Sequence, residues 1–164
     1  MVQKRQKSKD LPKIKEEEFE SRLVDLARVT RVTAGGKQLS FRACIVIGNK
    51  KGKVGEGTEK GSDVAIAIEK AIRRAKKNLI EVSIKEGTIP YQMKEKYSAA
   101  EVLLKPAPKG SGIKAGGSVR VVLELVGIEN IVSKILGSRN KISNVRATIN
   151  ALERLKPRAS LNNQ

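Results

Sequence analysis

The sequence has no histidine or tryptophan, and it contains one cysteine in 164 residues. Histidine is the side chain whose ordinary pKa lies in the physiological range, so its absence argues against acid–base and metal chemistry near neutral pH. The lone Cys44 excludes a disulfide framework or a zinc knuckle within the chain. Because it lies in the apolar segment 43–47 with no histidine to activate it, we interpret it as a buried hydrophobic residue. We expect a reducing, cytoplasmic compartment.

Aromatic residues and long apolar runs are also scarce. Aromatics make up 2% of the chain, whereas proteins that hold single-stranded nucleic acid usually stack bases on aromatic faces. No apolar run approaches the roughly 20 residues of a membrane helix, and the basic start lacks the apolar stretch of a secretory signal. We therefore expect no membrane partner. This composition favours a protein that contacts the backbone and shape of folded RNA, with a duplex-DNA binder as the alternative.

Positive charge is what the chain has in excess. Lysine and arginine total 34 against 17 acidic residues, which gives a formal net charge of +17. A surplus of this size has to be compensated by a polyanion or remain solvated, so nucleic acid is the expected partner. The other reading is a basic domain that is merely soluble.

Changes in pattern divide the chain into two small domains with polar ends. Residues 1–19 are predicted to be a disordered basic arm and an acidic turn, with a short helical turn over Glu16–Glu20. Residues 20–86 and 87–157 form the two domains, and 158–164 form a frayed tail. Domains of this size bury only about 60% of their unfolded surface, so we expect the halves to pack together.

The first domain is predicted to contain three strands. Residues 23–33 are rich in β-branched side chains, and 41–47 alternate with a period of two. A glycine-containing turn at 48–53 leads to a short return strand at 54–58, whose two glycines indicate a bulge or the close approach of another backbone. A helix follows over 64–79, where apolar residues recur at helical spacing.

The second domain is less regular. We expect a connector at 87–97, a strand at 101–106, a glycine-rich loop at 107–118 and a final helix over 142–155 that Pro157 ends. Residues 119–126 fit a strand or a helix equally well by pattern alone.

The glycine runs do not match nucleotide-binding motifs. Gly112 and Gly117 have the separation of a phosphate-binding P-loop, but Ser118 stands where that motif requires lysine. Gly52 and Gly57 fail at the same position. A nucleotide-dependent enzyme is thus a weak alternative, and we expect no enzymatic activity and no cofactor.

The candidate RNA-binding residues are basic and glycine positions at strand ends and turns. There, backbone amides and cationic side chains can approach RNA phosphates. These residues are Arg28, Arg31, Gly35, Gly36, Lys37, Lys50, Lys51, Lys53, Lys109 and Lys114.

Four segments, 29–37, 48–57, 110–120 and 144–148, resemble protein five of the small ribosomal subunit, bacterial type, in order and spacing. The resemblance covers roughly residues 20 to 156, and segment 110–120 is its most specific part. It implies an α+β chain of two small α/β domains. The first is similar to a double-stranded-RNA-binding fold, with three strands and a helix. The second is a split α/β domain in which 116–126 is helix and 131–137 is strand.

The resemblance also implies a role and partners. The role is that of a structural constituent which binds small-subunit ribosomal RNA and contributes to subunit assembly and translational accuracy, in a bacterial or organellar ribosome. The partners are proteins four and eight of that subunit and the region where mRNA enters. Segment 30–37 would lie beside the spectinomycin site. Gly112 and Arg120 would lie at the contact with protein four, where changes alter decoding accuracy.

The sequence departs from the family pattern at Ala34, where a basic residue is common, and at Glu56 and Glu59, in a stretch that is usually less acidic. The basic arm at residues 1–15 is not shared. A free-standing duplex-RNA-binding protein or RNA chaperone is the main alternative.

Overall fold

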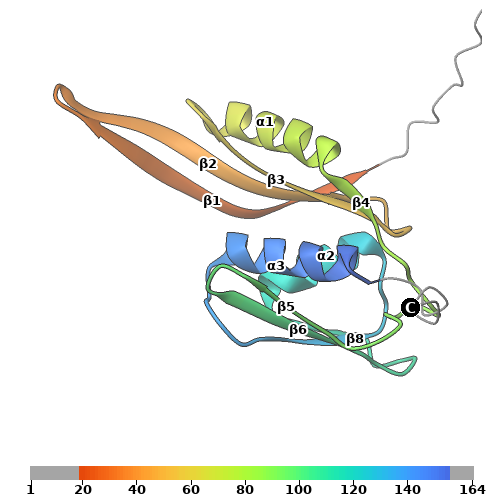
Figure 1. Ribbon diagram of the computed structural model, residues 1–164. Coiled ribbons are helices and arrows are strands. Elements are labelled where there is room, and N and C mark those ends of the chain that lie inside the picture. The colour runs from red at the N-terminus through yellow and green to blue at the C-terminus, as the bar shows by residue number, and fades with distance from the viewer. Residues whose placement is uncertain (1–18, 156–164) are drawn as a thin grey trace, which may run out of the picture.

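The computed structural model describes residues 19–155, and these form two domains stacked in four layers (Figure 1). The order is one helix, a first sheet, two helices and a second sheet. The first sheet has the strand order β1-β2-β3-β4 and comprises β1 (Glu20–Thr33), β2 (Gly36–Gly48), β3 (Lys53–Gly61) and β4 (Leu79–Glu81). The second has the order β5-β6-β8-β7 and comprises β5 (Met93–Tyr97), β6 (Ala100–Pro106), β7 (Ile113–Lys114) and β8 (Ile131–Ile135). The helices are α1 (Val64–Lys77), α2 (Gly117–Val126) and α3 (Lys141–Glu153).

Helix α1 lies unusually close to the first sheet because small residues meet at the contact. Ala67, Ala71 and Ala75 form a fully buried stripe on the helix. They face glycines of β3, and a Cβ built on Gly55 would lie only 2.5 Å from the carbonyl oxygen of Ala75. The close backbone approach expected of the β3 glycines is therefore present. The bulge lies elsewhere, in β1, where the register with β2 shifts between Leu23 and Asp25.

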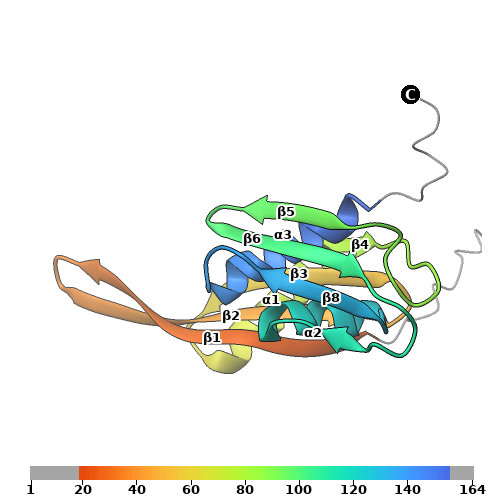
Figure 2. The same ribbon diagram turned by 90° about the horizontal axis from the view of Figure 1, so that it is seen from below.

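The second face of β2 is also buried, and the second domain covers it. Ala43, Ile45 and Ile47 pack with α1, whereas Val46 belongs to the same hydrophobic cluster as the core of the second domain. Packing between the halves, which small domain size predicts, is thus an extensive shared core. The C-terminal part of β2 thus lies between α1 on one side and α2 and α3 on the other (Figures 1 and 2).

A backbone joint adds to this core. The last carbonyls of a helix have no partner within the helix. At the end of α2, Leu125 and Val126 accept hydrogen bonds of 2.9 Å from the amides of Lys50 and Gly52, in the turn between β2 and β3. Gly127, at φ +93°, lies so close to this turn that an added Cβ would overlap the carbonyl of Lys50. Main-chain bonds and steric fit therefore fix the two domains against each other.

Several sequence expectations need correction. The first domain has a fourth strand, because β4 pairs with β3 from Lys53↔Glu81 to Gly55↔Leu79. The expected connector over 87–97 ends in β5, which pairs with β6. Glu20 begins β1, opposite Gly48, instead of ending a helical turn. Residues 117–126 are helical, as the resemblance implies. The predicted basic arm, Pro157 and the frayed tail lie outside the described residues.

Candidate nucleic-acid interface

The far ends of β1 and β2 form a two-stranded hairpin that extends beyond α1 and the second domain (Figure 1). We call residues 28–41 the hairpin arm. Its basic residues are Arg28, Arg31 and Lys37, all exposed, and it contains no carboxylate. Because side chains alternate along a strand, Arg28 and Arg31 project from opposite faces of the ribbon. The register pairs Lys37 with Val32, which places Lys37 on the face of Arg28. Both faces of the arm are therefore positively charged.

The tip of the arm is a tight turn of Ala34 and Gly35, and Gly36 follows it as the first residue of β2. Gly36 has φ +134°, a conformation that L side chains rarely adopt, whereas Gly35 has an ordinary φ. A Cβ at either position would meet no atom within 4 Å. Position 36 therefore needs glycine for its backbone conformation, although a side chain at either position would have space.

The arm also exposes apolar surface. Val32 is 73% and Leu39 52% exposed. Both lie on the face of Arg28 and Lys37, because Val32 pairs with Lys37 and Leu39 pairs with Thr30. On the opposite face, Arg31 and Lys60 line a hollow of about 310 Å³ together with Val29. A surface of this kind can hold a phosphate by charge while it packs a sugar or base edge against aliphatic carbon.

The predicted lysines of the β2–β3 turn lie elsewhere. The turn follows the opposite end of β2, a strand of 13 residues, so it is roughly 40 Å from the tip of the arm. Lys50 has its amide in the joint with α2, and its ammonium group forms an ion pair with Glu20. That contact lowers the pKa of Glu20. Lys51 is exposed and Lys53 is half-buried. The structure thus shows this turn as a contact between the domains, and RNA binding by its lysines stays a prediction.

The glycine-rich loop forms a third, separate region in the second domain. Lys109, Gly112 and Lys114 are exposed, and Gly112 has φ +66°. The loop is anchored where Gly112 donates to the Asn130 side chain at 3.2 Å and accepts from the Ile131 amide at 3.1 Å. Its outer edge is free to contact a partner.

Arg120, one turn into α2, is paired within the chain. Its Nε donates to Glu124 Oε1 at 2.8 Å, and Arg22 from β1 donates to the other carboxylate oxygen at 2.6 Å. The bond from Arg120 is the main cause of the lowered pKa of Glu124. The two Nη groups of Arg120 have no partner among residues 19–155, and the side chain is 56% exposed.

The structure reveals one site that the sequence did not predict, a polar contact between the domains. Arg146 of α3 donates to Glu56 of β3 at 3.1 Å and to the Tyr97 hydroxyl at 2.9 Å, and its guanidinium lies 5.5 Å from the centre of the Tyr97 ring. Burial opposes the charge, but the tyrosine and the carboxylate outweigh it and raise the pKa of Arg146. The acidic Glu56, noted in the sequence as a departure, thus has a structural partner. In the sequence, the only sign of this contact was an acidic residue, Glu56, in a mostly basic stretch.

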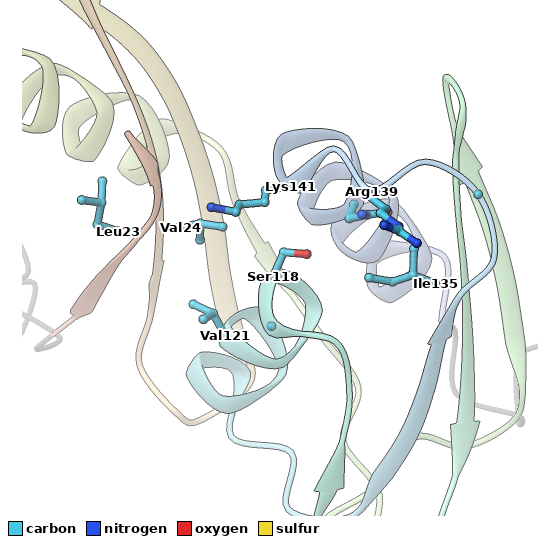
Figure 3. Close-up of a pocket in the computed structure, with 10 residues that line it drawn as sticks. Leu23, Val24, Ser118, Val121, Ile135, Arg139 and Lys141 are labelled. Carbon is cyan, nitrogen blue, oxygen red and sulfur yellow. The ribbon is translucent and has the colours of Figure 1, made fainter. Parts of the chain in front are cut away.

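A hollow of about 690 Å³ lies between β1 and the starts of α2 and α3 (Figure 3). Its lining combines aliphatic residues with Arg139 and Lys141, and Lys141 pairs with Asp25 at 3.3 Å. No carboxylate, cysteine or histidine lines it, so the hydroxyl of Ser118 has no carboxylate or imidazole base among the lining residues. Cys44 is buried in β2, and burial raises the pKa of its thiol.

Between residues 19 and 155, no three potential His, Cys, Asp or Glu ligands gather where they could hold a metal. Within those limits, no helix has the length and apolarity that crossing a membrane demands.

Comparison with known proteins gives a consistent result along the chain. Residues 19–83 match the family described as "Ribosomal protein S5, N-terminal domain", and 95–163 match "Ribosomal protein S5, C-terminal domain". The "Small ribosomal subunit protein uS5" of Thermotoga neapolitana is 52% identical over 142 residues, which cover 87% of this chain and 80% of the relative. The protein of that name from Campylobacter jejuni is 48% identical, with 89% and 99% covered. "Small ribosomal subunit protein uS5c" of Rhodomonas salina is 49% identical, with 93% and 90% covered.

Proposed function

Because this chain belongs to the ribosomal protein S5 family, we propose that it binds small-subunit ribosomal RNA through the hairpin arm and contributes to subunit assembly and translational accuracy. Its place is in the small subunit of a bacterial or organellar ribosome, where it is a structural constituent and not an enzyme. Proteins four and eight of the subunit are its proposed protein partners, close to the region where mRNA enters.

The observation that carries the proposal is the shape and charge of the arm. A ribbon that is cationic on both faces, free of carboxylates and extended beyond the body can enter a junction of folded RNA and contact phosphates on two sides. The scarcity of aromatic residues agrees with contacts to backbone and shape rather than with base stacking.

Binding and sedimentation test the proposal. The full chain should travel with small subunits in a sucrose gradient at moderate salt, whereas a free-standing RNA chaperone would remain near the top. The triple variant Arg28→Gln/Arg31→Gln/Lys37→Gln removes only exposed charges. It should reduce the slope of log K against log salt by about 2 to 3, at 0.7 to 0.9 per lost phosphate contact. An unchanged slope would contradict RNA binding by the arm.

The two tip glycines provide a matched pair. Gly36→Val forces a β-branched residue into a left-handed conformation, and Gly35→Val does not. Ribosomes with Gly36→Val should show an altered footprint under the tip and an altered spectinomycin response, and those with Gly35→Val a smaller change. Equal effects would mean that side-chain bulk, and not the turn, is what matters.

Arg120 and Gly112 are the residues that we propose for the contact with protein four. The Nη groups of Arg120, which have no partner between residues 19 and 155, can bind a carboxylate of protein four, and their loss should weaken the interface by roughly 1–3 kcal/mol. Stop-codon readthrough should therefore rise in cells whose ribosomes carry Arg120→Leu. Glu124→Gln is the control, because it removes the negative charge that pairs with Arg120 inside the chain but leaves Arg120 in place. Equal readthrough in both variants would assign the effect to the intrachain pair.

A further inference from the structure

The second sheet has one face that no other part of the described chain covers. Helices α2 and α3 pack on its inner face and separate it from the first domain (Figure 1). In the view from below, β5, β6 and β8 lie in front of α3, and no helix covers them (Figure 2). The outermost layer of the molecule is therefore an open sheet.

The register of the four strands shows which side chains share this open face. Cα partners in neighbouring strands point to the same side of a sheet, and residues two apart in a strand do so as well. The pairs Lys94↔Leu103 and Leu103↔Lys134 form one row, Lys105↔Val132 and Lys114↔Val132 form a second, and Lys96↔Glu101 forms a third. We call this set the lysine face: Lys94, Lys96, Glu101, Leu103, Lys105, Lys114, Val132 and Lys134. All five lysines are exposed.

The charge on the lysine face is largely uncompensated. Lys94 pairs with Glu101 at 2.7 Å, and the other four lysines form no ion pair with any residue between 19 and 155. The carboxylate of β5, Glu95, points to the inner side of the sheet and forms an ion pair with Arg154 at 2.8 Å. Lysines on this lattice are about 7 Å apart along a strand and about 10 Å apart across two strands. Such spacings are within the Debye length of about 10 Å at 0.1 M salt, so the ammonium groups repel one another until a polyanion binds.

We propose that the lysine face is a second RNA-binding surface, which contacts phosphates of a different RNA segment from the one bound by the hairpin arm. The inference rests on the proposed function, since it assigns a further contact to the same RNA partner. Lysine binds phosphate as a point charge and needs no fixed fork geometry, which suits a regular array on a sheet. A protein partner fits less well, because protein interfaces are depleted in lysine and centre on aromatic or arginine anchors that this face lacks.

Most lysines of this face are not among the candidate RNA-binding residues named from the sequence. Of its five lysines, only Lys114 was recognised there, because the others lie in segments with no glycine-rich turn. They come together only when β5, β6, β7 and β8 pair, and β5 was expected to be a connector.

Lysine acetylation of the full chain, read residue by residue by mass spectrometry, tests the proposal. The probe is a transcript of small-subunit ribosomal RNA, first alone and then with the other subunit proteins. RNA alone should protect Lys105, Lys114 and Lys134 several-fold, together with Lys37 of the arm. Protection of Lys37 without the lysine face overturns this inference and leaves the proposed function standing. Protection of neither overturns both. Protection of the face only after proteins are added means a protein partner, and also overturns the inference.

Charge variants supply an independent measurement. Lys105→Gln/Lys114→Gln/Lys134→Gln should lower the salt slope of RNA binding by about 2 to 3, whereas the matched Lys→Arg triple variant keeps the charges and should keep the slope. The substituted side chains are all exposed, so both variants should fold, and thermal unfolding verifies this. If the Gln variant binds RNA with the same salt slope as the unchanged chain, the lysine face is not an RNA surface.

Discussion

The contact between α1 and β3 allows a sharp test of the fold through Gly57. A Cβ at Gly57 would overlap the carbonyl oxygen of Ala71 and lie 2.7 Å from the amide nitrogen of Ala75. Carbon atoms make favourable contacts at about 3.5 Å or more, so Gly57→Ala should push the helix away from the strand. Both obstructing groups are backbone atoms in the middle of a helix, and neither can rotate away as a side chain would.

The magnitude follows from two opposing effects. Overpacking in a tight core costs about 1–3 kcal/mol, and a collision with backbone should be near the upper end of that range. Alanine is better than glycine within a regular element by about 0.5–1 kcal/mol, which offsets part of the cost. The net expectation is a loss of about 2 kcal/mol. For a chain of this size, such a loss lowers Tm by about 4–8 °C.

Thermal unfolding followed by circular dichroism measures this effect. Gly35→Ala is the control, because its new methyl group meets no atom within 4 Å and the residue has an ordinary φ. It should change stability by no more than about 0.5 kcal/mol. The double variant Gly57→Ala/Ala71→Gly should not recover stability, because the obstruction at Ala71 is its backbone oxygen. Equal Tm values for Gly57→Ala and Gly35→Ala would refute the close contact.

Three further predictions concern buried or paired groups. Cys44 should react with a thiol reagent such as DTNB only after unfolding, since it is buried and its thiol pKa is raised; rapid labelling of the native protein would contradict its placement. Glu56→Gln and Arg146→Met should show a coupling energy of about 1 kcal/mol in a double-mutant cycle of urea unfolding, whereas additive effects would mean that the bridge adds nothing. The carboxyl of Glu124 has a folded-state pKa below its ordinary value of 4.5, so between these two values the unfolded state binds more protons. Its stabilising contribution is complete above about pH 4.5 and is lost as the pH falls through the folded pKa, so Glu124→Gln should flatten the dependence of Tm on pH below about 4.5.

The strands and helices with strong periodicity were predictable from sequence, because their pattern records the burial of one face. Apolar residues at helical spacing over 64–79, including Ala71 and Ala75, marked α1, and alternation over 41–47 marked β2. That alternation was incomplete, since Cys44 and Val46 occupy the positions where an exposed face would carry polar residues. A strand buried on both faces reads as a continuous apolar run. This was the signal that a second layer covers β2.

Other features depend on contacts that no local pattern records. Strand β4 is three residues long and β7 is two, and such short pieces exist only because a longer strand lies beside them. In β5, Met93 and Tyr97 alternate with lysines, but Pro90 just before the strand made the segment resemble a connector. Lys50 reads as a free cation at a turn, but its neighbours Glu20 and Leu125 come from distant parts of the chain. Pairing partners of this kind follow from the tertiary fold alone.

The joint between the domains determines how the two proposed RNA surfaces can act. Two domains on a flexible linker would bind two RNA segments at any distance within reach, and would not distinguish folded from unfolded RNA. Here the amides of Lys50 and Gly52 bond to the end of α2, and Val46 lies in a core shared with the second domain. The base of the hairpin arm and the lysine face are therefore held at a fixed distance and orientation. An RNA can bind both without strain only if its own fold presents two segments at that spacing. Preference for correctly folded RNA then follows from the rigidity of the protein, and it requires none of the aromatic base-stacking residues that this chain has so few of.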